Sequence, residues 1–189
     1  MKDKQIIIGV TGHPSCGKDT VAEYLVTEHG FSSASTSDEI RRYMKENNLG
    51  EPTRERMSPI AQKMRTEQGA DILVRLALEH NKTAGRIVFG GIRAIAEADA
   101  VKRYGGSMIA VTAPIEVRFK RAQGRGRVGN DASFEAFKAI EEKESVGKNA
   151  SDQNVNAVVA QADYIINNTG TLPELYKKID EIVDEIVSK

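Results

Sequence analysis

Residues 12–20 constrain the fold of this chain more than any other stretch of its sequence. They read Gly-His-Pro-Ser-Cys-Gly-Lys-Asp-Thr, after an apolar run at 6–10 and before a helical pattern at 21–26. A strand, a glycine-framed loop with a lysine and then a helix is the context of a phosphate-binding P-loop. The glycines let backbone N–H groups face phosphate oxygens, and the helix N-terminus adds its positive dipole. We therefore expect a nucleoside triphosphate site. The alternative is a glycine-rich turn that only joins a strand to a helix.

The composition narrows the class of protein. The chain has 189 residues, enough for one domain with a substantial core. Its formal net charge is zero, which argues against binding nucleic acid through bulk charge. The single cysteine, Cys16, excludes an intrachain disulfide framework and favours a cytoplasmic protein. The apolar run near the N-terminus is too short for a signal peptide or a membrane span, so we expect no membrane partner.

Short β-rich runs alternate with longer helical patterns along the whole chain. This alternation predicts a single domain over 1–189 with a three-layer α/β/α P-loop NTPase fold and a parallel sheet of about five strands. The strands are expected at 5–11, 31–36, 86–91, 107–112 and 164–168. A helical insert at 37–83 separates the second and third strands, with helical patterns at 37–44, 53–69 and 71–79. An amphipathic helix is expected at 173–187.

A basic, glycine-rich stretch follows the fourth expected strand. It contains Arg118, Lys120, Arg121, Arg125 and Arg127, with glycines at 124, 126 and 129. Arginines on a glycine-rich flap are typical of a lid that closes over phosphates, so we expect a lid at 122–133. The alternative is a solvated basic loop. Within the P-loop, His13 either contacts a phosphate or fills space, and Cys16 is either a reactive thiol or a small packing residue.

The motif at 12–20 shares its proline and displaced threonine with the P-loop Gly-x-Pro-x-x-Gly-Lys-x-Thr of nucleoside monophosphate kinases. Nearly the whole chain resembles adenylate-kinase-like P-loop kinases. The resemblance is carried by this motif, by the segments at 36–41 and 89–93, and by the strand and turn at 162–172. The likeness is greatest to archaeal-type adenylate-kinase-related proteins and dephospho-CoA kinases. The resemblance implies ATP and Mg²⁺ as cofactors. The ATP-binding residues that it implies are Gly12, His13, Pro14, Ser15, Cys16, Gly17, Lys18, Asp19, Thr20, Asn168 and Gly170.

The same resemblance assigns catalytic and acceptor-binding residues. Lys18 would hold the donor phosphates, while Arg121 and Arg125, at the Arg-x3-Arg spacing, would neutralise charge on the transferring group. The expected acceptor-binding residues are Asp38, Arg41, Arg93 and Glu97. Alternatives remain for three of them. Arg41 would otherwise pair with Glu39 or Glu46, and Arg93 would otherwise be only an N-terminal helix residue after a Gly-Gly turn. Glu97 either reads an amine of the acceptor or pairs with Arg93.

One position departs from the family pattern. The family carries an acidic residue at the end of the third strand that helps to hold the magnesium water shell, and this chain has Gly90 there. Thr20 and Asp19 are the candidate metal-shell residues, with Asp38 as a further carboxylate nearby. The expected lid lacks the cysteine pairs that bind zinc in some adenylate kinases, so we expect no structural metal.

The resemblance favours an ATP-dependent kinase acting on a nucleotide, with a nucleoside monophosphate preferred over dephospho-CoA. A nucleotide-binding regulatory switch without turnover is the alternative from another class, and Gly90 is its best support. A helicase-like ATPase is disfavoured because the chain has no basic tract for nucleic acid. The expected partners are small-molecule nucleotides, with no nucleic acid and no membrane, and the chain is expected to be a monomer or a homodimer.

Overall fold

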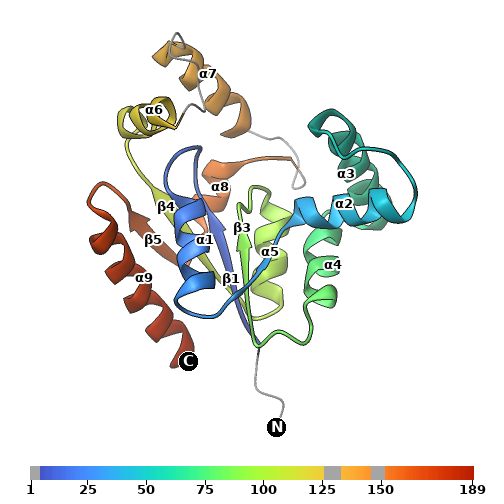
Figure 1. Cartoon of the computed structure of the whole chain (residues 1–189), viewed down its shortest axis with the longest axis horizontal. Helices are drawn as coiled ribbons and strands as arrows, with labels where there is room; N and C mark the ends of the chain where they lie inside the picture. The colour runs from blue at the N-terminus through green and yellow to red at the C-terminus, as the bar shows by residue number, and fades with distance from the viewer. Residues whose placement is uncertain (1–4, 126–132, 146–151) are drawn as a thin grey trace.

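A computed structural model describes residues 5–125, 133–145 and 152–189. These residues contain a five-stranded parallel sheet (Figure 1). Its strands are β1 (Ile6–Thr11), β2 (Ser32–Ala34), β3 (Arg86–Gly90), β4 (Ser107–Thr112) and β5 (Tyr164–Asn167), in the order β2-β3-β1-β4-β5. The predicted parallel sheet of about five strands is therefore confirmed. β1 lies at the centre and pairs with β3 on one side and β4 on the other.

Helices cover both faces of the sheet (Figure 1). The helices are α1 (Lys18–Thr27), α2 (Thr36–Glu46), α3 (Arg54–Gln68), α4 (Ile72–His80), α5 (Ile95–Arg103), α6 (Ile115–Gly124), α7 (Phe134–Ser145), α8 (Val155–Ala160) and α9 (Leu172–Val187). Successive side chains of a strand point to opposite faces. Ile7 accordingly packs in a cluster with residues of α4, α5 and α8, while Ile8 packs in a second cluster with residues of α1 and α9. The three-layer architecture follows from these two cores.

Helices α2, α3 and α4 form the predicted insert between the second and third strands (Figure 1). They pack around an apolar cluster of their own, made of Ile40, Met44, Ala61, Met64, Ile72 and Leu73. At the base of the insert, Arg103 of α5 binds Asp71 at 2.7 Å. The insert therefore has a small apolar core of its own, and its helix α4 packs against α5 of the sheet domain.

Several predicted boundaries differ from the structure. The second strand covers Ser32–Ala34 rather than 31–36, because the Ser35 hydroxyl accepts a hydrogen bond from the Ser37 backbone N–H and α2 begins at Thr36. In the predicted lid at 122–133, α6 continues to Gly124 and residues 126–132 lie outside the described part of the chain. None of the helices in the described ranges is long and apolar enough to cross a membrane.

Candidate active site

The P-loop joins β1 to α1 and requires glycine at two positions. Gly12 and Gly17 have φ angles of 144° and 104°, a backbone region that side chains rarely adopt. A Cβ at Gly12 would overlap the Val111 carbonyl oxygen, and a Cβ at Gly17 would overlap the Asn168 side-chain nitrogen. The two glycines that frame the motif are thus fixed by backbone conformation and by close packing against the ends of β4 and β5.

Two of the predicted site residues meet at the carbonyl oxygen of Cys16. The Nδ2 of Asn168 donates to this oxygen at 2.8 Å, and its backbone N–H donates to the Thr112 carbonyl. Arg121 of α6 donates to the same Cys16 oxygen through Nη1 at 3.4 Å. The end of β5 and the helix before the predicted lid therefore both contact the P-loop.

The side chain of Cys16 is buried and that of His13 is partly buried. Cys16 is fully buried in the cluster between the sheet, α1 and α9, and burial raises the pKa of its thiol. These features fit the packing role rather than a reactive thiolate. Burial also lowers the pKa of His13, against the opposing effect of the Glu141 carboxylate 3.7 Å from its Nδ1. His13 is thus favoured in its neutral form.

Lys18 opens α1 and is 6% exposed. Its Nζ lies 3.8 Å from the Oδ1 of Asp19. The turn after β3 passes close by, since a Cβ at Gly91 would lie 3.9 Å from Cε of Lys18. Three hydrogen bonds fix this turn against β1. The Thr11 hydroxyl donates to the Ile92 carbonyl at 2.7 Å, and the backbone N–H groups of Gly91 and Ile92 both donate to the Val10 carbonyl.

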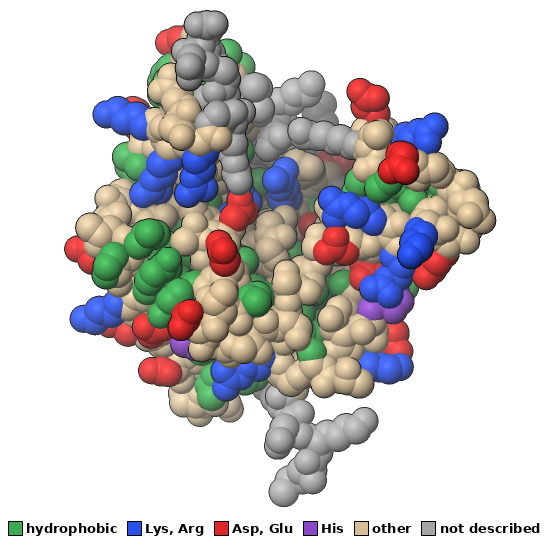
Figure 2. Space-filling view, in the orientation of Figure 1, with side chains coloured by type: hydrophobic (Ala, Val, Ile, Leu, Met, Phe, Trp, Pro, Cys, Tyr) green, Lys and Arg blue, Asp and Glu red, His purple; other side chains and the backbone are tan. Residues whose placement is uncertain are grey.

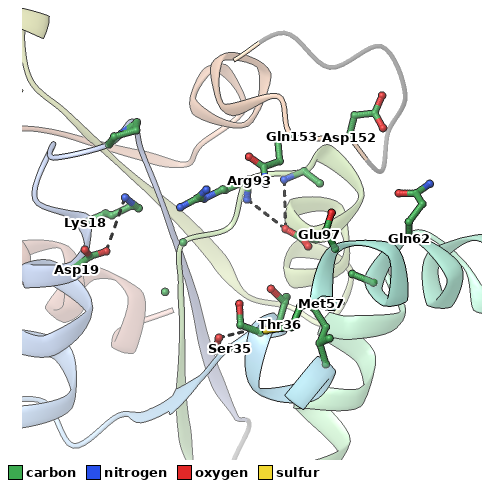
Figure 3. Close-up of a pocket in the computed structure, with 18 of the residues that line it drawn as sticks. Lys18, Asp19, Ser35, Thr36, Met57, Gln62, Arg93, Glu97, Asp152 and Gln153 are labelled. Atoms are coloured by element: carbon green, nitrogen blue, oxygen red, sulfur yellow. Dashed lines mark hydrogen bonds and ion pairs between the residues drawn. The ribbon is translucent and has the colours of Figure 1, made fainter. Parts of the chain in front are cut away.

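A cavity of about 970 Å³ extends from the P-loop to the insert (Figure 3). It is bounded by the P-loop, the N-terminus of α2, one side of α3, the turn between β3 and α5, parts of α6 and α7, and the residues just before α8. Its cationic lining residues are Lys18, Arg41, Arg65 and Arg93, and its acidic ones are Asp19, Glu97, Glu141 and Asp152. On the face shown in Figure 2, basic side chains lie along the upper part, from α6 across to the insert, with acidic side chains among them. The cavity therefore offers both cationic and acidic groups to a ligand.

Of the four predicted acceptor residues, three line the cavity and one does not. Arg41, Arg93 and Glu97 belong to its lining, whereas Asp38 does not. Asp38 instead binds Arg41 at 2.6 Å in an exposed i,i+3 pair, a contact of small energetic value. The partners suggested for Arg41 in the sequence were therefore wrong. Glu39, one of them, is buried against His80 of α4 at 2.7 Å.

Glu97 caps its own helix. Its Oε2 accepts hydrogen bonds from the backbone N–H groups of Arg93 and Ala94 at 3.3 Å, as Figure 3 shows. Its Oε1 accepts from Nη2 of Arg65 at 3.0 Å. The suggested pairing with Arg93 thus involves the backbone of that residue, and the ionic partner is Arg65. Sequence reasoning missed Arg65 because it lies inside a helical pattern whose apolar spacing indicated only packing.

The remaining predicted residues lie at the edges of the site. Arg125 is exposed at the end of α6, and Gly170 is exposed in the turn before α9; neither lines the cavity. Arg118, in the basic stretch, is buried and makes a bidentate ion pair with Glu141 of α7. Arg118 is thus a brace between two helices, while Arg127 lies outside the described residues.

The residues near Lys18 are compatible with the magnesium ion that accompanies ATP. Within the described ranges, no group of three or more His, Cys, Asp or Glu side chains forms a metal site. Magnesium bound with a nucleotide needs only one or two protein oxygens, because phosphates and water supply the others. Asp19 is exposed at the cavity wall and Thr20 follows it on α1, so a carboxylate and a hydroxyl are available beside Lys18.

A parallel sheet with a P-loop after its first strand and a cavity over its carboxyl edge defines a P-loop kinase-like domain. The chain belongs to the family whose model, described as an AAA domain, matches residues 8–147. It is 29% identical to a UPF0200 protein of Thermococcus kodakarensis over 97% of this chain and all of that protein. It is 32% identical to a UPF0200 protein of Saccharolobus solfataricus, covering 96% of this chain and 94% of the relative.

Solved structures show the same fold at low sequence identity. TT1252 from Thermus thermophilus superposes with a TM-score of 0.64 at 22% identity, covering 96% of this chain and 97% of that one. Shikimate kinase from Acinetobacter baumannii superposes with a TM-score of 0.57 at 15% identity, covering 97% of this chain and 95% of that one. Dephospho-CoA kinase from Campylobacter jejuni superposes with a TM-score of 0.53 at 20% identity, covering 95% of this chain and 96% of that one. These likenesses establish the kinase-like fold.

Proposed function

We propose that this protein is an ATP-dependent phosphotransferase that moves the γ-phosphoryl group of Mg-ATP to a nucleotide acceptor, with a nucleoside monophosphate favoured. The observation that carries the proposal is the single cavity running from Lys18 to the helical insert, with Arg41 and Arg93 in its lining. Such a cavity has room for a donor phosphate at one end and an acceptor at the other. The fold and the cytoplasmic location that the composition favours are consistent with a small-molecule kinase.

Phosphoryl transfer depends mainly on positioning and on neutralising charge. Lys18 and the P-loop amides would bind the donor phosphates. Magnesium would neutralise charge on these phosphates, with Asp19 and Thr20 oriented to its water shell. Arg121, which already contacts the P-loop, would donate to the transferring group. Arg41 and Arg93 would bind the acceptor phosphate, for which the planar guanidinium is better suited than lysine.

Arg125 stands apart in this scheme. It is exposed at the end of α6 and would act on the transferring group only after turning toward the P-loop. Gly170 likewise would contribute only by shaping the backbone of the turn that would lie near the adenine. We therefore assign the main catalytic charge to Lys18 and Arg121, with Arg125 as an accessory.

Dephospho-CoA kinase activity is the second candidate. The cavity of about 970 Å³ lies at the upper end of the volumes typical of small-molecule sites, which suits an acceptor larger than a mononucleotide. One structure with the same fold is a dephospho-CoA kinase. A third candidate, a nucleotide-binding switch with little turnover, rests on Gly90 at the end of β3.

A coupled assay of ADP release tests the proposal. Mg-ATP is offered with AMP, CMP, UMP, GMP, their deoxy forms or dephospho-CoA, to the protein and to Lys18→Ala. Lys82→Ala, at an exposed lysine of the turn after α4, is the matched control. The expected result is ADP release stimulated by one acceptor class, retained in the control and reduced about 100-fold or more in Lys18→Ala. Tight ATP binding with no stimulation by any acceptor would favour the switch.

A further inference from the structure

Arg65 occupies an unusual place in the cavity lining. It lies in the last turn of α3, its side chain is 18% exposed, and it faces the cavity from the insert. Its Nε is buried and has no hydrogen-bond partner among the described residues. A buried donor without a partner is unfavourable. Because Nε itself is enclosed, donation to a molecule in the cavity would come from the Nη atoms of the guanidinium.

The carboxylate of Glu97, the ionic partner of Arg65, already accepts several hydrogen bonds. The carboxylate is 5% exposed and accepts from Arg65 and from two backbone N–H groups at the start of α5. These bonds fix the guanidinium of Arg65 in position and leave the carboxylate little capacity for a further donor. The polar groups that this pair still offers to the cavity are therefore N–H donors of Arg65.

The pair lies away from the P-loop. Figure 3 shows Lys18 and Glu97 on opposite sides of the cavity, with the Arg93 side chain extending between them toward Lys18. Arg65 contacts Glu97 at 3.0 Å and so belongs to the far side. If Lys18 holds the donor phosphates and Arg93 the acceptor phosphate, the part of the acceptor that reaches Arg65 is the part that differs between acceptors, namely the base.

We propose that Arg65 is a specificity residue that selects acceptors whose base presents an oxo group toward the insert. The proposal rests on the proposed function and names the substrate class of that same cavity. Arginine has donors only. A carbonyl oxygen accepts from it, whereas an amino group at the same place is a second donor and leaves both groups unpaired. Nucleotides with a 6-oxopurine or a 4-oxopyrimidine should therefore bind better than their amino counterparts.

Two pairs of ligands differ at this position. IMP and AMP differ in the oxo or amino group at C6 of the purine together with the N1 proton, and UMP and CMP differ in the same way at C4 and N3 of the pyrimidine. Acceptor binding is measured by calorimetry in the presence of a non-hydrolysable ATP analogue and magnesium. The expected preference for the oxo member is about 10- to 100-fold, the range of a hydrogen bond to a charged group.

Arg65→Met removes the donors, while Arg65→Lys keeps the charge and part of the donor capacity. Arg75→Met is the matched control, because Arg75 lies in the same insert and pairs with Asp71 at 3.2 Å but does not line the cavity. We expect the oxo preference to be lost in Arg65→Met, to be partly kept in Arg65→Lys and to be unchanged in Arg75→Met. If Arg65→Met does not fold, Arg65→Met combined with Glu97→Gln removes the whole ion pair.

A purely structural role would lower the melting temperature without changing the ratio of affinities within each ligand pair. Equal affinities for both members in the unaltered protein, or an unchanged ratio in the Arg65 variants, would overturn the proposal while leaving phosphoryl transfer intact. Failure of every nucleotide to bind or to stimulate ADP release would instead remove the proposed function, and the role of Arg65 with it.

Discussion

The side-chain amide of Asn168 donates a 2.8 Å hydrogen bond to the backbone carbonyl of Cys16, and so ties the end of β5 to the P-loop. Because both groups are buried, Asn168→Ala leaves a carbonyl oxygen without this donor. We expect a loss of about 1–3 kcal/mol in the free energy of unfolding, measured in urea, and weaker ATP binding. The neighbouring exposed residue supplies the control, Asn167→Ala. Equal stability of the two variants would contradict the bracing role.

The buried thiol of Cys16 predicts how stability changes at alkaline pH. Burial raises its pKa in the folded state above the ordinary thiol value of about 8.5. Below that value both states hold the proton, so the contribution to stability is fully present. As pH rises past it, the unfolded chain loses the proton first and the contribution is lost. Urea unfolding between pH 7 and 10 should show a steeper decline for the unaltered protein than for Cys16→Ala. Parallel curves would refute the prediction.

Arg121→Met tests the contact between α6 and the P-loop. If Arg121 donates to the transferring group, kcat should fall about 10³-fold, while the Kd for ATP changes little. Lys120→Met, at the exposed preceding residue, should leave kcat unchanged. A rise in the Kd for ATP with an unaltered kcat would show that Arg121 acts in ground-state binding instead.

Gly90→Asp restores the acid that the resembling kinases carry at this position. Gly90 is exposed, and a Cβ there would meet only Ala22 Cβ at 3.7 Å, an ordinary contact. We therefore expect a folded protein with a melting temperature close to that of the unaltered chain. If the missing carboxylate limits turnover, the magnesium concentration for half-maximal activity should fall. The same magnesium dependence in both proteins would show that Asp19 and Thr20 suffice.

Much of the fold could be predicted because local patterns determine it. Apolar runs alternate with helical spacing, and the P-loop fixes the first strand, turn and helix together. The second strand was predicted too long because its boundary depends on the Ser35 cap, a single side chain in a serine-rich stretch. The structural role of Arg118 in the basic stretch was not predicted, because its bidentate bond to Glu141 joins two residues 23 positions apart along the chain.

The candidate site was predicted unevenly for the same reason. Lys18 could be located by the P-loop motif, and Asn168 and Arg93 by the resemblance of the segments at the strand ends to those of the kinase family. Arg65 lies 32 residues from Glu97 in the sequence, and only the packing of the insert, which contacts α5 through α4, brings them together. Asp38 was predicted at the acceptor site, but its place on α2 directs it to Arg41 at the surface, outside the cavity lining.

The central position of β1 also sets the order in which the chain can fold. Ile6 is aligned with Arg86 of β3, so the first strand has no partner until 80 further residues exist. At 5–20 residues per second, a ribosome takes about 4–16 s to add that length. The apolar β1 and the P-loop that follows it therefore remain without a sheet partner during this time, and factors that bind nascent chains can reach them before the sheet forms.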